Sequence, residues 1–266
     1  MRKMYWTDLR TSKIQCANAD GSDVKDLVAN GLRIPNSIAI DGDEGKMYWT
    51  DAGTSKIQRA NLDGSDVEDL ITTDVYLPGG MTVHGKKKKI YWTDAAWGET
   101  MGCKVQRADL DGSHVETLVF TEMSIPNGIV LDLDMGKMYW TDLTKIQRAD
   151  LDGSHVEILV FTELLPLGIA LDVGEEKMYW TNYKGAGVSK IQCANLDGSD
   201  VEDLVTVGLD RPSGIALDVV KGKMYWGDYD NYGTAKIQCA NTDGSDVEDL
   251  VTAGLDRPSG IALCCF

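Results

Sequence analysis

The sequence is poor in basic residues, and it lacks any long apolar run. Its 26 lysines and arginines against 42 aspartates and glutamates give a net charge of −16. Nucleic-acid binding requires a basic surface, so we expect no nucleic-acid partner. No stretch is long and apolar enough to span a bilayer, so we expect no direct membrane insertion. The one basic run, residues 86–89, is interpreted as a solvated turn.

Histidine is scarce, which limits the catalytic chemistry available. The three histidines are His84, His114 and His155, and none accompanies a serine or cysteine in a nucleophile-elbow or triad-like context. His114 and His155 follow Asp-Gly-Ser turns, and His84 replaces an aspartate that ends an expected strand. We therefore expect all three to be surface or turn residues. We expect no catalytic residue and no enzyme.

Targeting and glycosylation signals are also missing. No Asn-x-Ser/Thr sequon occurs, and the first residues lead directly into an aromatic motif without a signal-peptide pattern. We expect either an intracellular protein or an excised or mature fragment.

Six copies of one four-residue motif organise the chain. Successive copies are 43, 43, 48, 40 and 46 residues apart, and a period in this range indicates an array of similar supersecondary units. The copies are Tyr5-Trp6-Thr7-Asp8, Tyr48-Trp49-Thr50-Asp51, Tyr91-Trp92-Thr93-Asp94, Tyr139-Trp140-Thr141-Asp142, Tyr179-Trp180-Thr181-Asn182 and Tyr225-Trp226-Gly227-Asp228.

Each repeat contains four strand-length segments. In the second repeat they are residues 37–41, 46–50, 56–61 and 66–71, rich in β-branched or aromatic residues and bounded by Gly, Asp, Asn or Pro. Asp63-Gly64 lies between the third and fourth segments, and an Asp-Gly pair recurs there in every repeat. This pair predicts a tight hairpin in which both central residues have positive φ. Each repeat is thus expected to form a four-stranded antiparallel meander.

The pattern of large side chains predicts how the six sheets assemble. Met47-Tyr48-Trp49 places large side chains on both faces of the second strand, so both faces must be covered. Radial stacking achieves this in a six-bladed β-propeller, and no segment has the 3.6-residue apolar period of a helical solenoid. The chain starts at a second strand and ends at a first strand, so the C-terminal strand should complete blade one and close the ring. With no linker or composition shift, residues 1–266 are interpreted as one all-β domain.

These motifs resemble a known family. Tyr-Trp-Thr-Asp with a preceding Pro-x-Gly-Ile-Ala-Leu-Asp, as in residues 212–218, is similar to the class B (YWTD) repeats of the low-density-lipoprotein receptor and nidogen families. The resemblance covers the whole chain. It implies a six-bladed propeller with a protein-interaction role, usually extracellular. No cysteine-rich EGF-like module follows the sixth repeat, and residues 190–205 and 236–251 differ at one position in sixteen, as after recent duplication or in a repetitive scaffold.

The cysteines do not form an evident disulfide framework. Cys16, Cys193 and Cys239 share one repeat position, which other copies fill with arginine, so we expect this position to be solvent-accessible. Equivalent positions in different repeats should lie too far apart to bridge. Cys264 and Cys265 are adjacent, and Cys103 lies in a loop. Free thiols favour a reducing compartment, so an intracellular location is the alternative to the extracellular one that the resemblance implies.

The repeated charged residues are interpreted as structural. The motif aspartate lies at a strand end, where it can accept hydrogen bonds from backbone groups, and in the resembled family it ties blades together. A lysine starts each third segment and is expected to face that aspartate. These lysines are Lys13, Lys56, Lys104, Lys145, Lys190 and Lys236.

The central channel is one candidate position for a metal site, because some six-bladed propellers are metal-dependent lactonases. Its mouth should carry the residues that follow proline, which are Asn36, Gly79, Asn127, Leu167, Ser213 and Ser259. Two asparagines without an acid make a poor divalent-cation site, so we expect no metal and no cofactor.

The variable loops indicate where a ligand binds. The loops between second and third strands hold four, four, nine, two, seven and seven residues, whereas the third-to-fourth turns are near-copies. Variation of this kind belongs on functional loops. These loops share one face with the crossings between blades, which we call the top face. Exposed aromatics and arginines are common binding anchors. The candidate ligand-binding residues there are Trp97, Tyr183, Tyr229, Tyr232, Tyr76, Arg33, Asn36, Asn127, Arg211 and Arg257.

The sequence therefore predicts a module that binds a protein or peptide through the top face around the channel mouth. Two alternatives stay open. One is an enzyme of the six-bladed lactonase or hydrolase type, and the other is a repeat scaffold without a specific ligand. The aromatic rings could also simply pack down their own loops.

Overall fold

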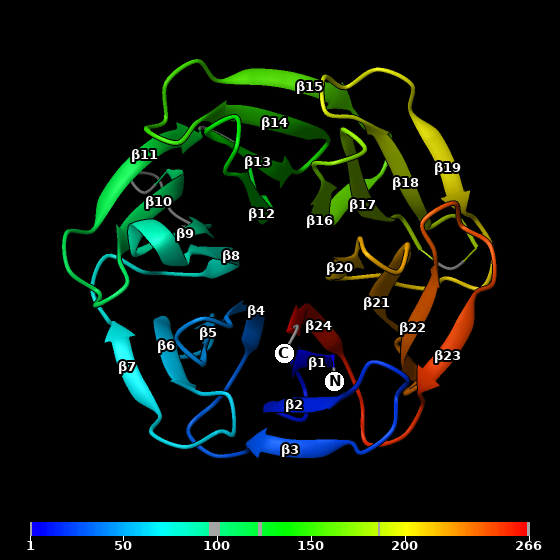
Figure 1. Cartoon of the computed structure of the whole chain (residues 1–266), viewed down its shortest axis with the longest axis horizontal. Helices are drawn as coiled ribbons and strands as arrows, with labels where there is room; N and C mark the ends of the chain where they lie inside the picture. The colour runs from blue at the N-terminus through cyan, green and yellow to red at the C-terminus, as the bar shows by residue number, and fades with distance from the viewer. Residues whose placement is uncertain (1, 96–101, 122–123, 186, 265–266) are drawn as a thin grey trace.

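The repeats form a ring of six sheets around a central channel (Figure 1). The computed structural model describes residues 2–95, 102–121, 124–185 and 187–264. Each sheet contains four antiparallel strands, with the first strand next to the channel and the fourth at the rim. The predicted six-bladed β-propeller is confirmed.

The strands follow the repeat boundaries closely. Blade one contains β24 (Pro258–Cys264), β1 (Lys3–Asp8), β2 (Lys13–Asn18) and β3 (Lys25–Val28). Blade two contains β4 (Pro35–Asp41), β5 (Lys46–Asp51), β6 (Lys56–Asn61) and β7 (Glu68–Ile71). Blade three contains β8 (Pro78–His84), β9 (Lys89–Asp94), β10 (Cys103–Asp109) and β11 (Glu116–Thr121), with the 3-10 helix η1 (Gly85–Lys87) between its first two strands.

The second half of the ring repeats this order. Blade four contains β12 (Pro126–Asp132), β13 (Lys137–Asp142), β14 (Lys145–Asp150) and β15 (Glu157–Phe161). Blade five contains β16 (Leu165–Asp172), β17 (Lys177–Tyr183), β18 (Lys190–Asn195) and β19 (Glu202–Val205). Blade six contains β20 (Ile215–Asp218), β21 (Lys223–Tyr229), β22 (Ala235–Asn241) and β23 (Glu248–Val251).

The ring closes without a covalent link. The C-terminal strand β24 pairs with β1, with Tyr5 opposite Ala262 and Trp6 opposite Ile261. The backbone N–H of Asp256 also donates to the Asp8 carboxylate over 2.8 Å. The expected completion of blade one by the C-terminal strand is therefore confirmed.

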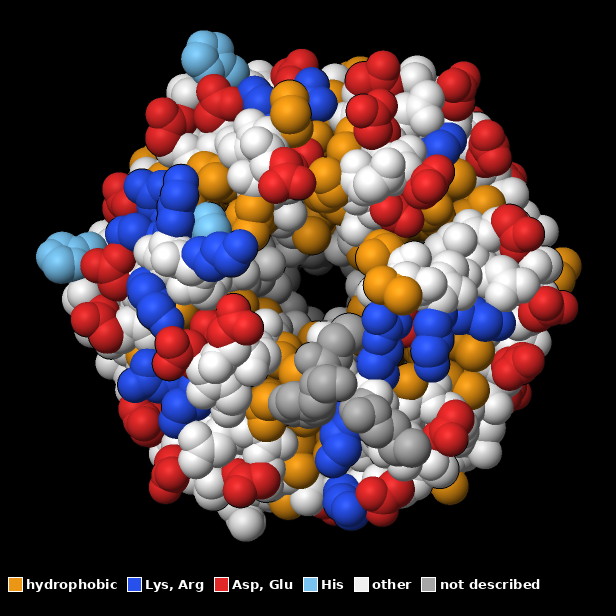
Figure 2. Space-filling view, viewed as in Figure 1, with side chains coloured by type: hydrophobic (Ala, Val, Ile, Leu, Met, Phe, Trp, Pro, Cys, Tyr) orange, Lys and Arg blue, Asp and Glu red, His pale blue; other side chains and the backbone are white. Residues whose placement is uncertain are grey.

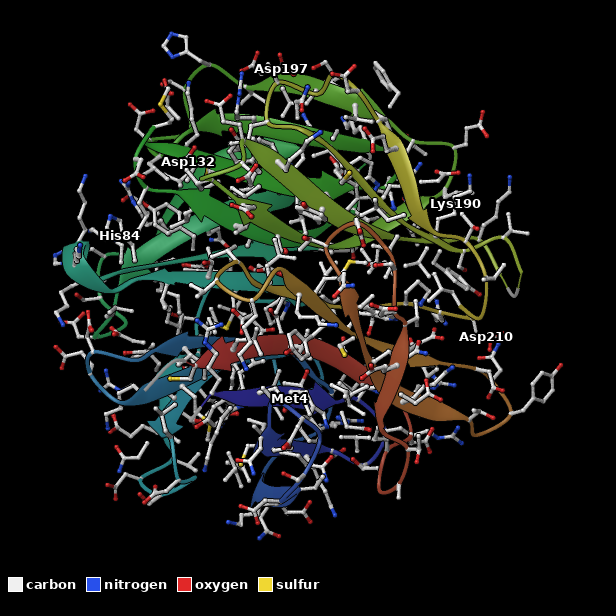
Figure 3. All side chains as sticks on the ribbon, turned by 45° about the vertical axis from the view of Figure 1, so that its right-hand side comes forward. Met4, His84, Asp132, Lys190, Asp197 and Asp210 are labelled. Carbon is white, nitrogen blue, oxygen red and sulfur yellow. The ribbon has the colours of Figure 1, made fainter. Side chains whose placement is uncertain are left out.

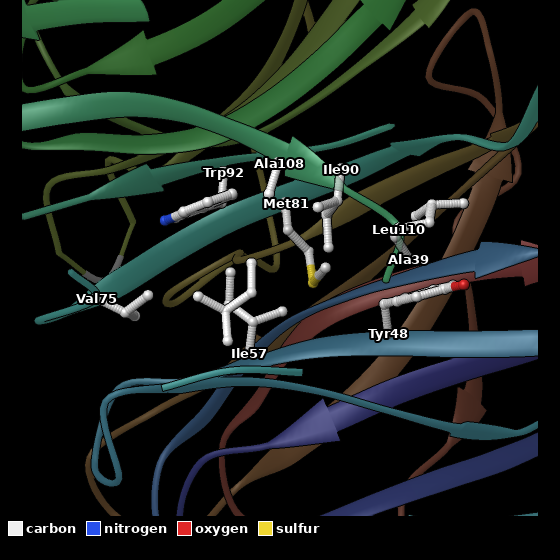
Figure 4. Close-up of a cluster of buried hydrophobic side chains, with 10 residues drawn as sticks. Ala39, Tyr48, Ile57, Val75, Met81, Ile90, Trp92, Ala108 and Leu110 are labelled. Atoms are coloured by element: carbon white, nitrogen blue, oxygen red, sulfur yellow. The ribbon is translucent and has the colours of Figure 1, made fainter. Parts of the chain in front are cut away.

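The core lies between neighbouring blades. In one cluster, Tyr48 and Ile57 of blade two pack against Met81, Ile90 and Trp92 of blade three (Figure 4). All six motif tryptophans have no exposed surface. Burial of one such ring stabilises the fold by roughly 5 kcal/mol before the loss of conformational entropy is counted. The same pairing recurs around the ring, so each blade depends on both neighbours.

The two ends of the strands form two distinct faces. The top face carries the second-to-third loops and the crossings, as expected, because Pro35 at the start of β4 pairs with Asp51 at the end of β5. The opposite face, called the bottom face, carries η1 and the third-to-fourth hairpins. Figures 1 and 2 look onto the bottom face, and Figure 2 shows the open central channel.

The Asp-Gly hairpins differ from the predicted turn. In blade one Gly21 has a φ of 83°, but Asp20 does not have a positive φ. The Gly21 N–H donates to the Asn18 carbonyl, and the Asn18 N–H donates to the Ser22 carbonyl. This is the three-residue hairpin, a type I turn followed by a left-handed glycine. The expectation of two central residues with positive φ was wrong.

A second left-handed residue in each hairpin explains where two histidines lie. Asp66 has a φ of 54°, and His114 occupies the equivalent position with a φ of 53°. Asp and His both tolerate this region better than most residues. Asn61 bonds Asp66 in blade two, whereas Asp109 bonds His114 in blade three, so donor and acceptor are exchanged together. His114 and His155 are exposed, as expected.

His84 does not lie on the surface. It is the last residue of β8 and is 5% exposed, and burial lowers its pKa. Asp132 and Asp218 end the equivalent strands and are buried in the same way. Figure 3 shows His84 and Asp132 toward the bottom face, away from Asp210 in a top-face crossing. At the equivalent position, Asp218 of blade six forms an ion pair with Arg2 of blade one, so this strand end faces the next blade there. The sequence pattern did not reveal this contact.

The position shared by cysteine and arginine is buried where it holds cysteine, contrary to expectation, and half-buried where it holds arginine. Cys16, Cys193 and Cys239 are free thiols with 2–5% exposure. Where arginine occurs, its side chain extends across the gap between blades. Arg107 donates to the Leu151 carbonyl of the next blade over 2.9 Å and lies against Tyr91. Arginine is tolerated because it reaches a partner at the blade boundary, while cysteine fills the same site as a small apolar residue.

Each repeated lysine lies directly opposite the motif aspartate, or Asn182 in blade five, across the second and third strands, as expected. Most of their ammonium groups nevertheless form ion pairs with other carboxylates. Four of them pair with an aspartate on the fourth strand of the same blade. These pairs are Lys13–Asp26, Lys56–Asp69, Lys190–Asp203 and Lys236–Asp249. Within the described residues, an ion pair between such a lysine and the motif aspartate occurs in blade four, where Ile158 replaces the fourth-strand aspartate and Lys145 lies 3.8 Å from Asp142.

Candidate functional site

A pocket opens at the top-face mouth of the channel, where the six first strands begin. Its volume is about 190 Å³. Five of the six predicted mouth residues line it; Gly79 does not, although its neighbour Gly80 does. The lining residues used below are Asn36, Ser37, Asn127, Arg211, Tyr229 and Ser259. We call this the mouth pocket.

The motif threonines hold the mouth together. The Thr7 hydroxyl accepts the Gly260 N–H of its own blade and donates to the Asn36 carbonyl of the next blade over 2.8 Å. Thr93 donates in the same way to the Asn127 carbonyl, over 2.6 Å. Each such hydroxyl forms hydrogen bonds to the first strands of two neighbouring blades and so connects them at the channel rim.

Blade six achieves the same connection by a different route. Gly227 replaces the threonine, and the Ser213 hydroxyl donates to the Pro258 carbonyl of blade one over 2.6 Å. A Cβ at position 227 would lie 3.0 Å from that hydroxyl and 2.9 Å from that carbonyl. The glycine and the serine are therefore complementary substitutions. The sequence showed the missing threonine but not the serine that replaces it.

Glycine allows the first strands to approach closely. A Cβ at Gly128 would lie 2.6 Å from the Leu167 carbonyl oxygen of the next blade. Ser37 occupies the same position in blade two, and its hydroxyl accepts the Met81 N–H over 3.1 Å. The Pro-x-Gly pattern thus sets the width of the channel mouth.

Two arginines and two tyrosines form a continuous array beside the mouth pocket. The Arg211 guanidinium carbon lies 4.3 Å from the centre of the Tyr183 ring and 5.7 Å from that of Tyr229. Arg257 lies 5.8 Å from the Tyr229 ring. Tyr183 ends β17 and Tyr229 ends β21, while both arginines lie in crossings. We call these four residues the Tyr–Arg array.

The motif aspartates position this array. The Asp228 carboxylate accepts the backbone N–H groups of Asp210 and Arg211. Asp8 accepts the N–H of Arg257 in the same way. The expected role of these aspartates in bonding backbone groups is confirmed. Burial raises the pKa of Asp228 to about 6, which the two N–H groups only partly offset.

Of the remaining candidate residues, Tyr232 lies beside the Tyr–Arg array, whereas Tyr76 and Arg33 lie away from the mouth pocket. Tyr232 is 96% exposed and borders a small depression with Tyr183, Arg211 and Tyr229. Tyr76 lies in another crossing, with the Lys104 ammonium 5.3 Å from its ring centre. Arg33 is exposed beside Gly53 and does not line the mouth pocket. Trp97 lies outside the described residues.

The lining of the mouth pocket has more apolar than polar surface, and it includes hydrogen-bonding groups and one positive charge. Asn36 Oδ1 accepts the Ser259 hydroxyl over 2.9 Å, and the Asn127 amide donates to the Ile125 carbonyl over 3.2 Å. Arg211 is the one charged residue in the lining. Across the described part of the chain, no group of three or more His, Cys, Asp or Glu side chains is arranged to hold a metal ion. The described residues also contain no helix long and apolar enough to cross a membrane.

Solved structures with this architecture include proteins of low sequence identity. A chain of the nidogen/laminin complex is 22% identical, with a TM-score of 0.84 over 99% of this chain and 98% of that one. A putative TolB from Agrobacterium tumefaciens is 14% identical, with a TM-score of 0.73 over 97% of this chain and 91% of that one. TolB from Acinetobacter baumannii is 15% identical, with a TM-score of 0.77 over 98% of this chain and 66% of that one. At these identities the likeness establishes the fold.

Comparison with protein-family models identifies the individual repeats of this chain. No curated protein sequence matches the chain. The low-density lipoprotein receptor repeat class B model matches residues 2–41, 45–84, 88–133, 136–173 and 176–219. These matches cover most of the chain and coincide with successive motif copies. The chain therefore belongs to the low-density lipoprotein receptor repeat class B family.

Proposed function

We propose that this propeller is a protein- or peptide-binding module that holds its ligand at the top face, around the mouth pocket. The observation that carries the proposal is the Tyr–Arg array beside the mouth pocket, on the face where the loops vary. The bottom-face hairpins are near-copies and offer no comparable local difference. The fold is shared with a chain of a nidogen/laminin complex, in which a propeller protein assembles with another protein.

The dimensions of the pocket favour part of a polypeptide over a large buried ligand. A volume of about 190 Å³ is smaller than typical small-molecule sites, which hold roughly 300–1,000 Å³. It accommodates one or two side chains. Asparagine and serine around it supply hydrogen bonds, and the tyrosines supply contact area with little loss of side-chain entropy. A peptide strand or loop seated across the mouth would use both.

The test is a selection from a phage-displayed random peptide library on the immobilised protein. We expect enriched peptides whose affinity falls at least tenfold when Tyr232→Ala and Asn127→Ala are introduced together, since loss of one anchor costs about 2 kcal/mol. Tyr232 is exposed, so this substitution should leave the melting temperature unchanged. The control is Met135→Ala with Val220→Ala, which removes two largely exposed side chains from the bottom face. Peptides that lose affinity only for this control protein would contradict the proposal.

A further inference from the structure

In the described part of the chain, the arginines without an ion pair share one face of the ring. Five of the eight arginines form an ion pair with a carboxylate. Within the described residues, the three without an ion pair are Arg33, Arg211 and Arg257, and all three lie in top-face crossings. In a chain with 16 more acidic than basic residues, unpaired arginines gathered on one face require an explanation. A ligand that brings its own negative charge provides one.

The Arg211 guanidinium is held in place by aromatic contacts, but its hydrogen-bond donors lack partners within the described residues. Arg148, by contrast, donates to Glu157 and to the Leu196 carbonyl. In the part of the chain that the structure describes, the Arg211 side chain has no hydrogen-bond partner and no ion pair. Its plane packs against Tyr183, over 4.3 Å, and such packing leaves the N–H edges of a guanidinium available. Those edges match the two oxygens of a carboxylate.

Arg257 adds a second uncompensated positive charge. Its Nε atom is buried and has no hydrogen-bond partner among the described residues. It lies 5.8 Å from the ring of Tyr229, which Arg211 also contacts. Contact with an aromatic ring stabilises a cation without neutralising it. The array therefore holds two positive charges next to the mouth pocket.

The pocket lining is also unusually poor in groups that repel an anion. No carboxylate lines the mouth pocket. The Asn36 and Asn127 carbonyl oxygens at the rim accept hydrogen bonds from Thr7 and Thr93, which reduces their capacity to repel an anion. Asp210 and Asp230 border the neighbouring depression on the Tyr232 side, and the Asp228 carboxylate is occupied by backbone N–H groups. An incoming carboxylate thus meets Arg211 from the channel side.

We propose that the mouth pocket recognises a carboxylate of a peptide ligand, held by the guanidinium of Arg211, with Tyr183, Tyr229 and Arg257 fixing and reinforcing that group. This inference rests on the proposed function and specifies the chemistry of its ligand. The carboxylate comes either from an aspartate or glutamate side chain or from the C-terminus of the partner. Both sources present the same two oxygens, so the experiment separates them.

The direct test uses small probes and the side-chain Nε–H signals of arginine in nuclear magnetic resonance spectra. The probes are N-acetyl-aspartic acid amide for a side-chain carboxylate, N-acetyl-alanine for a terminal one, and N-acetyl-asparagine amide as the uncharged match. We expect a saturable shift of the Arg211 signal with at least one carboxylate probe, at least tenfold weaker binding of the asparagine probe, and no saturable shift at Arg33. The shift should weaken with added salt. Equal responses to the charged and uncharged probes, or none at Arg211, would overturn the proposal.

Variants of the same residue separate charge from geometry. Arg211→Gln should abolish carboxylate binding, and Arg211→Lys should retain it only weakly, because lysine lacks the planar fork. Arg33→Gln removes an unpaired arginine from an equivalent crossing and should bind the probes as the unchanged protein does. Equal loss in Arg33→Gln and Arg211→Gln would indicate a general charge effect and contradict a specific site.

The selected peptides distinguish this inference from the proposed function. If acidic residues or the free C-terminus of those peptides can be replaced by amides without loss of affinity, the carboxylate site is wrong while the binding module stands. If no peptide is selected but the carboxylate probes still shift Arg211, the site stands and the peptide-binding function is wrong. Loss of affinity on amide replacement, restricted to proteins that retain Arg211, supports both.

Discussion

At the residue scale, single positions show how one motif serves different blades. The motif aspartate accepts backbone N–H groups of the preceding crossing, and Asn182 takes its place in blade five with no exposed surface. An amide is therefore tolerated where most blades carry a carboxylate. The Asn182 amide instead donates to Gln192 Oε1, and its Oδ1 has no hydrogen-bond partner among the described residues. Gly227 and Ser213 exchange the threonine hydroxyl for a serine hydroxyl at the rim. This exchange does preserve a hydrogen bond between neighbouring blades while changing side-chain volume.

Asp228 should make stability depend on pH. Its pKa is about 6 in the folded protein and near 3.8 when unfolded, so the folded state binds more protons between these values. Stability should then fall as pH rises from about 4 to about 6, by up to roughly 3 kcal/mol from this group. Asp228→Asn should flatten that part of the profile, since an amide does not titrate. Urea unfolding at a series of pH values measures the effect.

The control for this prediction is Asp230→Asn in the same loop. The pKa of Asp230 is lowered by backbone N–H groups, so its contribution changes below the pH 4–6 window. This variant should keep the slope of the unchanged protein. An Asp228→Asn protein with an undiminished slope would show that burial of this carboxyl does not control the pH dependence.

At the element scale, the third-to-fourth hairpins are part of the contact between blades. A Cβ at Gly64 of blade two would lie 2.3 Å from the Leu27 carbonyl oxygen of blade one. Equivalent glycines in the other blades meet the previous fourth strand in the same manner, as Gly21 meets Leu250. The Asp-Gly-Ser turn is therefore uniform because it must both reverse the chain and lie against its neighbour. The second-to-third loops also reverse the chain, but they do so with lengths of two to nine residues.

Two glycines with similar φ angles distinguish the effect of chain reversal from the effect of contact with the neighbouring blade. Gly64 has a φ of 87° and would clash, whereas Gly31 has a φ of 78° with no atom within 4 Å of a built Cβ. We expect Gly31→Ala to cost about 1–2 kcal/mol through backbone strain alone. Gly64→Ala should cost about 3 kcal/mol, because the neighbouring backbone must also move.

Chemical denaturation of both variants measures this difference. Circular dichroism should show unchanged strand content in Gly31→Ala. If the two substitutions lower the free energy of unfolding equally, the hairpin does not press on the neighbouring blade, and the uniform turn reflects chain reversal only.

At the scale of the whole molecule, stability depends on a closed ring. Every blade buries its Tyr and Trp side chains against a different neighbour, so an open ring would expose two such faces. Blade one is assembled from both ends of the chain, and the Thr7, Asp8 and Trp6 side chains are all fully buried there. We propose that residues 1–266 unfold as one unit, because no blade has a core of its own.

Deletion of residues 258–266, which removes β24, should abolish the cooperative transition or cause aggregation. The deletion exposes the edge of β1 and the apolar faces that β24 covers. The readouts are gel filtration and thermal unfolding. Ile261→Ala serves as the milder comparison, because it keeps strand pairing and removes a side chain that is 7% exposed. It should retain a cooperative transition with a loss of about 2–5 kcal/mol. A soluble monomer with unchanged melting after the deletion would contradict closure by β24.

The sequence by itself determined the blades, their number, their strand order and the closure of the ring. These follow from local signals, because strand periodicity, turn residues and the Tyr-Trp motif all act within about forty residues. It also identified Asn36, Asn127 and Ser259 as mouth residues, since the residue after each crossing proline must begin an inner strand. The face that carries the variable loops followed from the meander alone.

Only the tertiary structure decided which side chains are buried and which of them contact one another, within a blade or across a blade boundary. It placed His84 and Cys16 in the interior, paired Lys13 with Asp26, and brought Tyr183 to Arg211. It also left Tyr76 and Arg33 away from the mouth pocket. The repeat pattern states which positions are alike, but partners on adjacent blades are dozens of residues apart. Their contacts depend on the distance and rotation between blades, which are set by packing of the whole ring.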